Sequence, residues 1–446
     1  MIYRFTCSNI SQSHKEGTMK ANDNFSVLAG FKELPKHLNS TTISSGVIAG
    51  IFGWATALIL YANGNTCGWS TQETISWIFA CWVFGPLIGA YLTLKYRLPI
   101  PGAWSISGAA IVVSGAAAGY TLKQLCAGFL MAGILVFILG VTGLIDRVMR
   151  LLPMPIVMGM TAGCLFKFVT NDVGYLYSWV SKPEGNNLKF LGIGIVAILV
   201  FLVVTRFKAQ IKVVPPILAA LVVVVLGVII FGLYDTSALA GLRFYGPKFI
   251  GYDFSNIGGV FVSVTIPLTF LVIGAENAQA VGVLQAQGYT APIKSMTIMS
   301  GVGGMITSLF GGHNANIAGP MTAITASKES GENLDDRYAA AFVCEVFCSI
   351  IGIFASIVVP FLNTMPINLI YLVGGLAMIG VILGAIKDAF STSKFQMSAF
   401  FAFFFALSQN SFFGIGSAFW SLLVGVIVAL ILEPKDFINQ IKGVEA

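Results

Sequence analysis

The chain has 446 residues, of which 56% are hydrophobic and 10% charged, and its formal net charge is +6. A soluble domain has about 25% charged residues, so this composition excludes a soluble globular protein and indicates an integral membrane protein. Seven cysteines, an odd number lying mostly in apolar runs, suggest no disulfide framework, and in a membrane protein the positive charge reports topology, so no nucleic-acid partner is expected.

Residues 1–39 are polar and of mixed charge, and they lack the continuous apolar core of a signal peptide. We predict that they form a cytoplasmic N-terminal tail, with Met19 as an alternative start. At the other end, residues 434–446 are predicted to form a cytoplasmic C-terminal tail.

Between the tails, apolar runs of about 20 residues follow one another, each long enough to cross about 30 Å of hydrocarbon as a helix. Polar residues, prolines and glycines divide this region into fourteen predicted membrane segments. The segments are 40–62, 72–94, 99–118, 121–143, 153–178, 188–205, 213–233, 256–285, 292–310, 312–327, 338–362, 366–386, 395–411 and 413–432.

The basic residues test this number. If both termini face the cytoplasm, nineteen of the 25 Lys and Arg fall on that side, five fall on the other, and Lys167 lies within a segment. Because basic residues concentrate on the cytoplasmic side, this asymmetry favours an even number of crossings with both ends inside.

Fourteen crossings divide into two halves of seven, and an odd number of crossings inverts the second half relative to the first. Inverted repeats are typical of secondary transporters. The fold class predicted is therefore an all-α membrane protein with two inverted repeats of seven segments.

Two segments at matching positions of the halves contain residues that interrupt helices. The third, "RLPIPGAWSISGAAIVVSG", has Pro99 and Pro101, and the tenth, "FGGHNANIAGPMTAITAS", has Gly311, Gly312 and Pro320. Proline cannot donate a helical hydrogen bond, so each segment is predicted to run as extended chain and then as a short helix. The alternative is two ordinary kinked helices.

Few ionisable residues remain inside the segments. An ionised side chain at the bilayer centre costs about 2.5 to 3.5 kcal/mol on insertion scales, so each one needs a reason. Five such residues are found: Lys167, Asp172, Glu276, His313 and Glu345.

Glu276 lies near the middle of the eighth segment, in "TFLVIGAENAQAVGVL". A carboxyl group in a cleft whose access to water changes can take up and release a proton, as coupling to a proton gradient requires. The alternative is a carboxyl hydrogen-bonded to a neighbouring helix. His313 is equally consistent with a proton relay and a structural role, whereas structural roles are favoured for Lys167, Asp172 and Glu345.

The sequence contains no motif typical of a bound cofactor or of catalysis. The chain has three histidines, two of them in the N-terminal tail, so no metal site is expected. There is no His or Cys cluster or Asp pair at catalytic spacing and no ATP-binding domain, so neither an enzyme nor an ATP-driven pump is expected.

A half-helix that begins inside the membrane directs free N–H groups and the positive end of its dipole at the gap before it. Two half-helices from opposite halves would suit an anion or the carbonyl edge of a polar ring. Trp104 and Ser105 precede one half-helix, and Asn314, Asn316 and Ile317 precede the other.

Six sequence strings, in this order, resemble the BenE family of bacterial benzoate and proton symporters, over almost the whole chain from the second segment onward. They are "SW" at 76–77, "PIPGAWSISGAA" at 99–110, "ENAQAVGVLQAQGY" at 276–289, "FGGHNANIAGPMTAI" at 310–324, "RYAAA" at 337–341 and "GIGSAFWSLLVG" at 414–425.

This resemblance implies a fold like that of the uracil permease group, in the bacterial inner membrane and as a possible homodimer. A core domain would comprise 40–143 and 254–362, and a gate domain 144–233 and 363–433. The substrate would bind between segments three and ten, against segment eight. By this likeness the substrate-facing residues are Trp104, Ser105, Glu276, Asn277, Asn314 and Asn316, and the half-helix argument adds Ile317. The candidate proton-coupling residues, Glu276 and His313, follow from their own chemistry.

Two residues depart from the family pattern. Benzoate-type members often carry Gln at the position of Glu276, whereas nucleobase permeases carry Glu, and His313 stands where a less ionisable residue is expected. The function predicted is proton-coupled uptake of an aromatic carboxylate such as benzoate. A nucleobase symporter and a small-anion channel stay open as alternatives.

Overall fold

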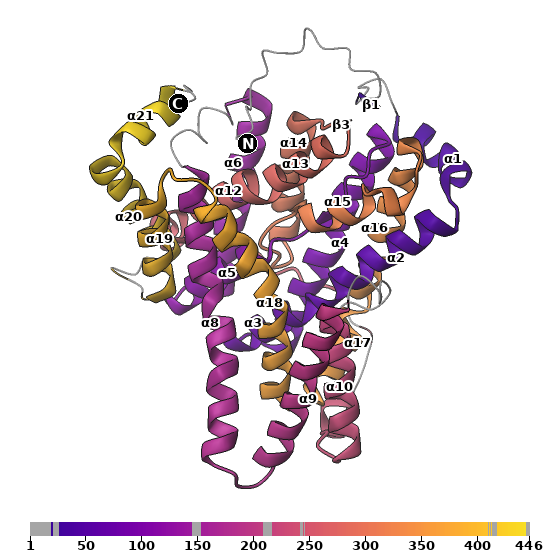
Figure 1. The fold of residues 1–446 in the computed structure, drawn as a ribbon, viewed down its shortest axis with the longest axis vertical. Coiled ribbons are helices and arrows are strands. Elements are labelled where there is room, and N and C mark those ends of the chain that lie inside the picture. Colours follow the sequence, from indigo (N-terminus) through magenta and orange to yellow (C-terminus); the bar gives the residue numbers. More distant parts are fainter. Residues whose placement is uncertain are drawn as a thin grey trace.

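The protein is almost entirely helical. The computed structural model describes residues 19–20, 26–144, 153–207, 216–240, 244, 246–408, 410, 412 and 417–442, with two pairs of two-residue strands among the helices. In Figure 1, the helices α1 (Val27–His37) and α21 (Pro434–Lys442) lie at the upper end of the molecule, and the connection between α8 and α9 lies at the lower end.

Helices form along the chain where the apolar runs predict them. In the first half they are α2 (Ser40–Ala55), α3 (Ala57–Thr66), α4 (Thr71–Tyr96), α5 (Ile106–Ala117), α6 (Leu122–Thr142), α8 (Met154–Ser181), α9 (Asn187–Arg206) and α10 (Pro216–Ile230). In the second half they are α11 (Ile257–Val260), α12 (Ile266–Leu271), α13 (Ala278–Ala286), α14 (Ile293–Ser308), α15 (Gly319–Thr325), α16 (Arg337–Ile353), α17 (Ala355–Asn363), α18 (Ile367–Phe390), α19 (Gln396–Ser408) and α20 (Ser417–Leu432).

Each of the fourteen predicted segments therefore contains at least one helix. By length and apolarity, four of the described helical runs could cross a membrane (Thr71–Tyr96, Leu122–Thr142, Asn187–Arg206 and Ile257–Gln285), or six if two bent pairs each count as one span. The prediction of a helical membrane protein with broken helices is confirmed, and the number of fourteen crossings stays a prediction.

Three segments are less regular than the sequence analysis expected. The first is interrupted at Thr56, whose hydroxyl donates to the Gly53 carbonyl at 2.7 Å. The eleventh bends by 60° between α16 and α17, and α17 contains Pro360, which has no backbone N–H to donate. The eighth contains two π-helical stretches, Phe261–Thr265 (η2) and Val272–Asn277 (η3), which a periodicity of 3.6 residues does not predict.

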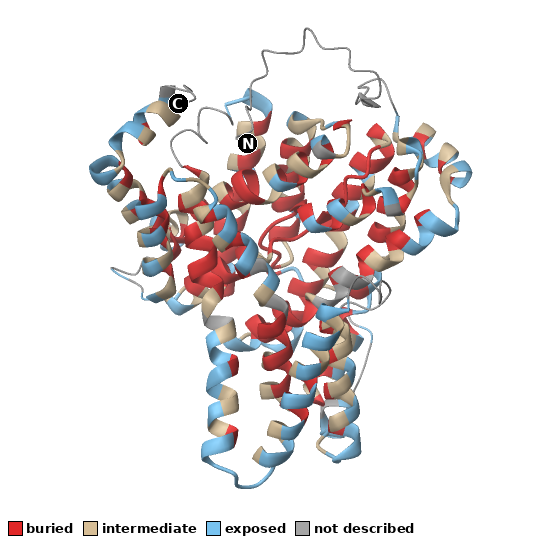
Figure 2. Ribbon diagram, viewed as in Figure 1, coloured by how far each residue is buried: buried red, intermediate tan, exposed pale blue. Residues whose placement is uncertain are grey.

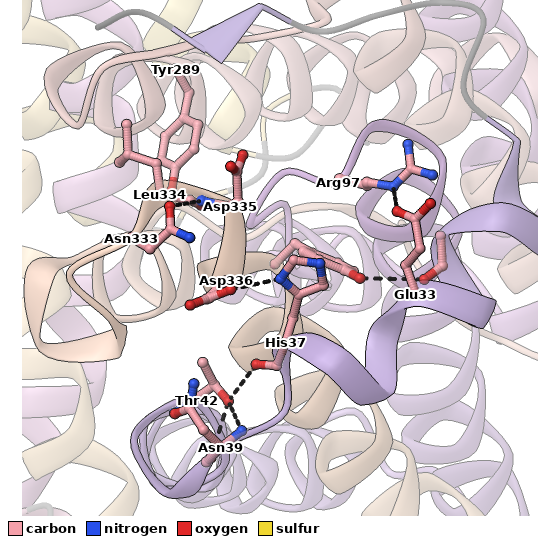
Figure 3. A network of polar contacts seen from close by, with 12 residues as sticks. Glu33, His37, Asn39, Thr42, Arg97, Tyr289, Asn333, Leu334, Asp335 and Asp336 are labelled. Carbon is pink, nitrogen blue, oxygen red and sulfur yellow. Dashed lines mark hydrogen bonds and ion pairs between the residues drawn. The ribbon is translucent and has the colours of Figure 1, made fainter.

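The region predicted as an N-terminal tail is partly folded onto the helices. α1 is held by a hydrogen bond between His37 Nδ1 and Asp336 Oδ1 at 2.6 Å, and by an ion pair between Arg97 and Glu33 at 2.7 Å (Figure 3). Strand β1 (Met19–Lys20) also pairs in parallel with β3 (Tyr289–Thr290).

The helices pack in two groups. In one, α6 lies against α14, and α16 lies against α2 and α4. In the other, α8 lies against α18 and α19, α9 against α10, and α19 against α20. Buried residues gather in the upper and central part of the molecule, while the lower ends of α8, α9 and α10 are largely exposed (Figure 2). Exposed apolar residues on these helices suit contact with lipid.

Candidate functional site

The two broken segments meet at a short strand pair near the centre of the first helix group. β2 (Gly102–Ala103) pairs antiparallel with β4 (Asn316–Ile317), and the Ala318 N–H donates to the Pro101 carbonyl at 2.8 Å. Each strand leads into a short helix, α5 or α15. The prediction of extended chain followed by a half-helix is therefore confirmed for both segments.

Extended backbone at membrane depth requires partners for its N–H groups, and side chains supply several of them here. Glu345 Oε1 accepts from the Gly102 N–H at 2.5 Å, and Asn314 Oδ1 accepts from the Ser105 N–H at 3.0 Å. Asn277 Oδ1 accepts from the Ile317 N–H at 3.0 Å. The interrupted backbone of both halves is thus stabilised by side chains of the second half of the chain.

Glu276 lies on the π-helical stretch η3, in the helix group of the broken segments. Its Oε1 accepts a hydrogen bond of 2.5 Å from the Ser105 hydroxyl, which directly precedes α5. The side chain is partly exposed, and η3 also contacts α8 of the other helix group. The carboxyl group therefore lies where the two halves of the chain and both helix groups come together.

His313 is fully buried and both of its ring nitrogens are engaged. The Trp77 indole N–H donates to Nδ1 at 3.0 Å, and Nε2 lies 2.8 Å from the Ser105 carbonyl. An indole can only donate, so Nδ1 is the acceptor and Nε2 carries the hydrogen that Ser105 accepts. In this arrangement His313 holds the Ser105 backbone, and a proton relay would require one of these two bonds to break.

The asparagines continue the network. Asn314 Nδ2 donates to Asn316 Oδ1 at 2.8 Å, and Asn316 Nδ2 donates to the Ile317 carbonyl at 3.1 Å. Asn277 Nδ2 donates to Ser300 Oγ of α14 at 3.0 Å. The predicted site residues are therefore brought together, and their polar groups are largely bonded to one another.

Trp104 packs into an aromatic cluster. Its side chain is 4% exposed, and its ring meets Trp82 and His313 edge to face at centroid distances of 5.9 and 5.8 Å. Such edge-to-face contacts fix the orientation of the rings. Trp104 thus presents a rigid apolar surface next to Ser105.

The half-helix ends are less free than the sequence analysis expected. The Ser105 hydroxyl already accepts from the Gly108 N–H at 2.9 Å, and Pro320 in the first turn of α15 has no N–H. Fewer free helix N–H groups therefore face the gap between the two half-helices than the sequence analysis expected.

The other ionisable residues are placed differently. Glu345 joins the site through Gly102, whereas Asp172 is buried between α8 and Gly375 of α18. The side chain of Lys167 lies outside the described residues. Within the described chain, no three His, Cys, Asp or Glu side chains gather where a metal ion could bind.

Two residues of the network, Trp77 and Ser300, were not predicted as site residues. Trp77 lies in one of the sequence strings on which the family resemblance rests. Its place there indicated that the residue matters, but it did not indicate a hydrogen bond to His313. Ser300 is an unremarkable serine in an apolar helix, and only its position opposite Asn277 gives it significance.

Comparison with known proteins gives a family match and two relatives. The family described as benzoate membrane transport protein (BenE) matches residues 36–431. The inner membrane protein YdcO of Escherichia coli K12 is 29% identical over 395 residues, which are 88% of this chain and 96% of that protein. The benzoate membrane transport protein of Acinetobacter baylyi is 25% identical over 408 residues, 91% of this chain and 98% of that one.

Solved structures share the fold at low sequence identity. The transmembrane domain of the cyanobacterial bicarbonate transporter BicA matches with a TM-score of 0.56 and 14% identity, covering 88% of this chain and 97% of that one. SLC26A9 matches with a TM-score of 0.61 and 13% identity, covering 91% of this chain and 68% of that one. These two similarities show a common fold of membrane transport proteins.

Proposed function

The chain belongs to the BenE family of benzoate membrane transport proteins, and from this membership we propose that it imports benzoate or a closely similar aromatic carboxylate together with protons. It is a membrane transporter and not an enzyme. The Acinetobacter baylyi relative, which carries the name of a benzoate transporter and aligns with 91% of this chain, supports the substrate. The Escherichia coli relative supports an inner-membrane location.

The contact between Glu276 and Ser105 is the observation that carries this proposal. A carboxylate substrate bound beside Ser105 would place its negative charge near the Glu276 carboxyl. Two neighbouring carboxylates repel one another, so the substrate and a proton on Glu276 favour each other's binding. A proton gradient would then drive accumulation of the substrate.

Alternating access would follow from movement of the two helix groups. We assign segments 40–143 and 254–362 to a core domain and 144–233 and 363–433 to a gate domain, in fourteen crossings with inverted halves. The packing of α8 against α18 and α19, and of α6 against α14, supports this division. The contact between η3 and α8 would be the place where gate movement changes the access of water to Glu276.

The substrate site proposed lies around the strand pair. Trp104 would pack against the aromatic ring, and Ser105 would face the carboxylate. Asn277, Asn314, Asn316 and Ile317 would shape the site by holding its backbone, and His313 would fix the Ser105 carbonyl. Glu276 would be the proton-coupling residue, whereas the hydrogen bonds of His313 favour a positioning role for that residue.

Replacement of Glu276 by Gln tests the coupling. The amide cannot exchange a proton, so we expect the variant to lose accumulation of labelled benzoate driven by a pH gradient in proteoliposomes. Exchange of labelled for unlabelled benzoate should persist. Asp172→Asn makes the same chemical change in a buried carboxyl that lies against α18, and it should accumulate benzoate as the parent does. Accumulation by Glu276→Gln equal to that of the parent would exclude Glu276 as the coupling residue.

The substrate is tested by thermal unfolding of the purified protein. A bound ligand stabilises the folded state by mass action, so benzoate and other aromatic carboxylates should raise the unfolding temperature more than uracil, xanthine or inorganic anions do. A larger shift with uracil or xanthine would favour the nucleobase alternative. Flux that neither saturates nor depends on the proton gradient would favour a small-anion channel.

A further inference from the structure

Glu345 of α16 is a buried acid whose carboxyl group contacts the broken third segment directly. Its side chain is 1% exposed, and Oε1 accepts from the Gly102 N–H at 2.5 Å. The second oxygen, Oε2, is buried and makes no hydrogen bond within the described part of the chain. Burial of an ionisable side chain inside a membrane protein costs free energy, so the contact of Glu345 with the strand is expected to have a function.

The helix α4 is shaped to permit this contact. A Cβ atom at Gly89 would collide with both Glu345 Oε1 and the Gly102 nitrogen, and one at Gly85 would lie 2.7 Å from the Ala103 carbonyl carbon. Two glycines one helical turn apart therefore let β2 lie directly against α4. Glu345 reaches the strand through the space that Gly89 leaves.

The extended chain from Gly102 to Ser105 is consequently held at both of its ends. Glu345 holds the Gly102 N–H, while Asn314 and His313 hold the N–H and the carbonyl of Ser105. Trp104 lies between these two fixed ends, and Ser105 is one of them. Their positions relative to Glu276 therefore depend on the contact that Glu345 makes.

We propose that Glu345 is a positioning residue for the transported substrate, which fixes the extended chain 102–105 so that Trp104 and Ser105 lie correctly beside Glu276. This inference rests on the proposed function, because it takes Trp104 and Ser105 to face the substrate. The role requires a hydrogen-bond acceptor at Oε1 and no exchange of protons. Glutamine supplies that acceptor and alanine does not.

Hydrogen–deuterium exchange of the unliganded protein tests the structural part of the proposal. Glu345→Ala leaves the Gly102 N–H without its acceptor, so amides in the peptide that contains residues 102–105 should exchange about tenfold faster. Glu345→Gln should exchange like the parent, and so should Cys348→Ala, which removes another buried side chain from α16. If Glu345→Ala fails to fold, Glu345→Asp, which withdraws the carboxyl by one methylene, should show the same effect to a smaller degree.

Benzoate binding and uptake test the functional part. We expect Glu345→Ala to raise the Kd for benzoate about tenfold, and Glu345→Gln to keep the Kd, the accumulation driven by protons and the pH profile of uptake. A purely structural role elsewhere in α16 would lower the amount of folded protein without changing the Kd of the protein that remains.

Three results would overturn the inference. The first is unchanged hydrogen–deuterium exchange at residues 102–105 in Glu345→Ala or in Glu345→Asp, and the second is an unchanged Kd for benzoate in Glu345→Ala. The third is loss of proton-driven accumulation in Glu345→Gln. The last result would make Glu345 a proton carrier. Failure of the parent to bind any aromatic carboxylate would contradict the proposed function alone, because the exchange measurement needs no ligand.

Discussion

Ser105 is the residue at which the hydrogen bonds of the site converge. Its hydroxyl donates to Glu276 and accepts from Gly108, its N–H donates to Asn314, and its carbonyl accepts from His313. Buried networks of this kind rigidify a site when every member is bonded, and a missing member is costly because no water replaces it. The chemistry of Glu276 therefore depends on residues that never need to contact a substrate.

Replacement of Trp77 by Phe tests this dependence at the residue scale. The change removes the indole donor to His313 Nδ1 and leaves this buried nitrogen only the weak Cys81 thiol, 3.6 Å away, which should destabilise the protein by about 1 to 3 kcal/mol. Trp69→Phe is the matched control, because the contact of Trp69 with Trp77 is an edge-on ring contact at 4.7 Å. Thermal unfolding of the two variants gives the comparison, and equal unfolding temperatures would mean that the indole N–H contributes nothing.

At the scale of elements, glycines determine how closely the helices approach. α6 and α14 pack backbone against backbone, since a Cβ at Gly301 would lie 2.5 Å from the Phe137 nitrogen and one at Gly133 would lie 2.7 Å from the Met305 nitrogen. Small residues at such crossings let helices associate in a membrane, where lipid is as apolar as the helix surface. This close packing gives the broken segments a rigid support.

Gly301→Ala should therefore destabilise the protein by about 1 to 3 kcal/mol, because the added methyl group meets backbone that cannot yield. Gly174→Ala in α8 is the control, since a Cβ at Gly174 meets nothing within 4 Å, and alanine is favoured over glycine in a helix by about 0.5 to 1 kcal/mol. The two variants should shift the thermal unfolding temperature in opposite directions. A Gly301→Ala variant as stable as the parent would mean that α6 and α14 separate easily.

The two ends of the whole molecule carry different helices, and apolar helices are exposed at one of them (Figure 2). α1 and α21 lie at the end opposite the connection between α8 and α9 (Figure 1). Burial within the protein differs as well, from 67% of the most apolar window of α4 to 17% of that of α9. Such a difference is expected when some helices form a core and others face lipid.

Thiol labelling in intact cells tests the orientation, in a background with Cys7 and Cys67 replaced by serine. We expect Glu184→Cys, in the exposed connection between α8 and α9, to react with a membrane-impermeant maleimide from the periplasm. Ser391→Cys, in the exposed connection after α18, should react only after the inner membrane is opened. Labelling of both positions from the same side would contradict the seven predicted crossings, segments six to twelve, that lie between them.

Composition and the spacing of apolar runs were sufficient to predict the helical membrane protein, a helix in each of the fourteen segments and the two interruptions, but not α1 and α21, which lie in the regions predicted as tails. These are local properties: proline has no N–H wherever it stands, and an apolar run of about 20 residues fits the bilayer as a helix whatever surrounds it. The acid at position 276 and the polar residues before the half-helices could be selected for the same reason, since polar groups in hydrocarbon require partners.

The partners themselves were decided by the tertiary structure. Three hydrogen bonds show this: Gly102 donates to Glu345, Trp77 donates to His313 and so fixes its tautomer, and Ser105 donates to Glu276. Each bond joins residues that are more than a hundred positions apart in the sequence. The π-helical stretch that contains Glu276 and the bend between α16 and α17 likewise depend on packing and hydrogen bonding. Sequence determines which groups need a partner, and only the folded arrangement determines which partner each one obtains.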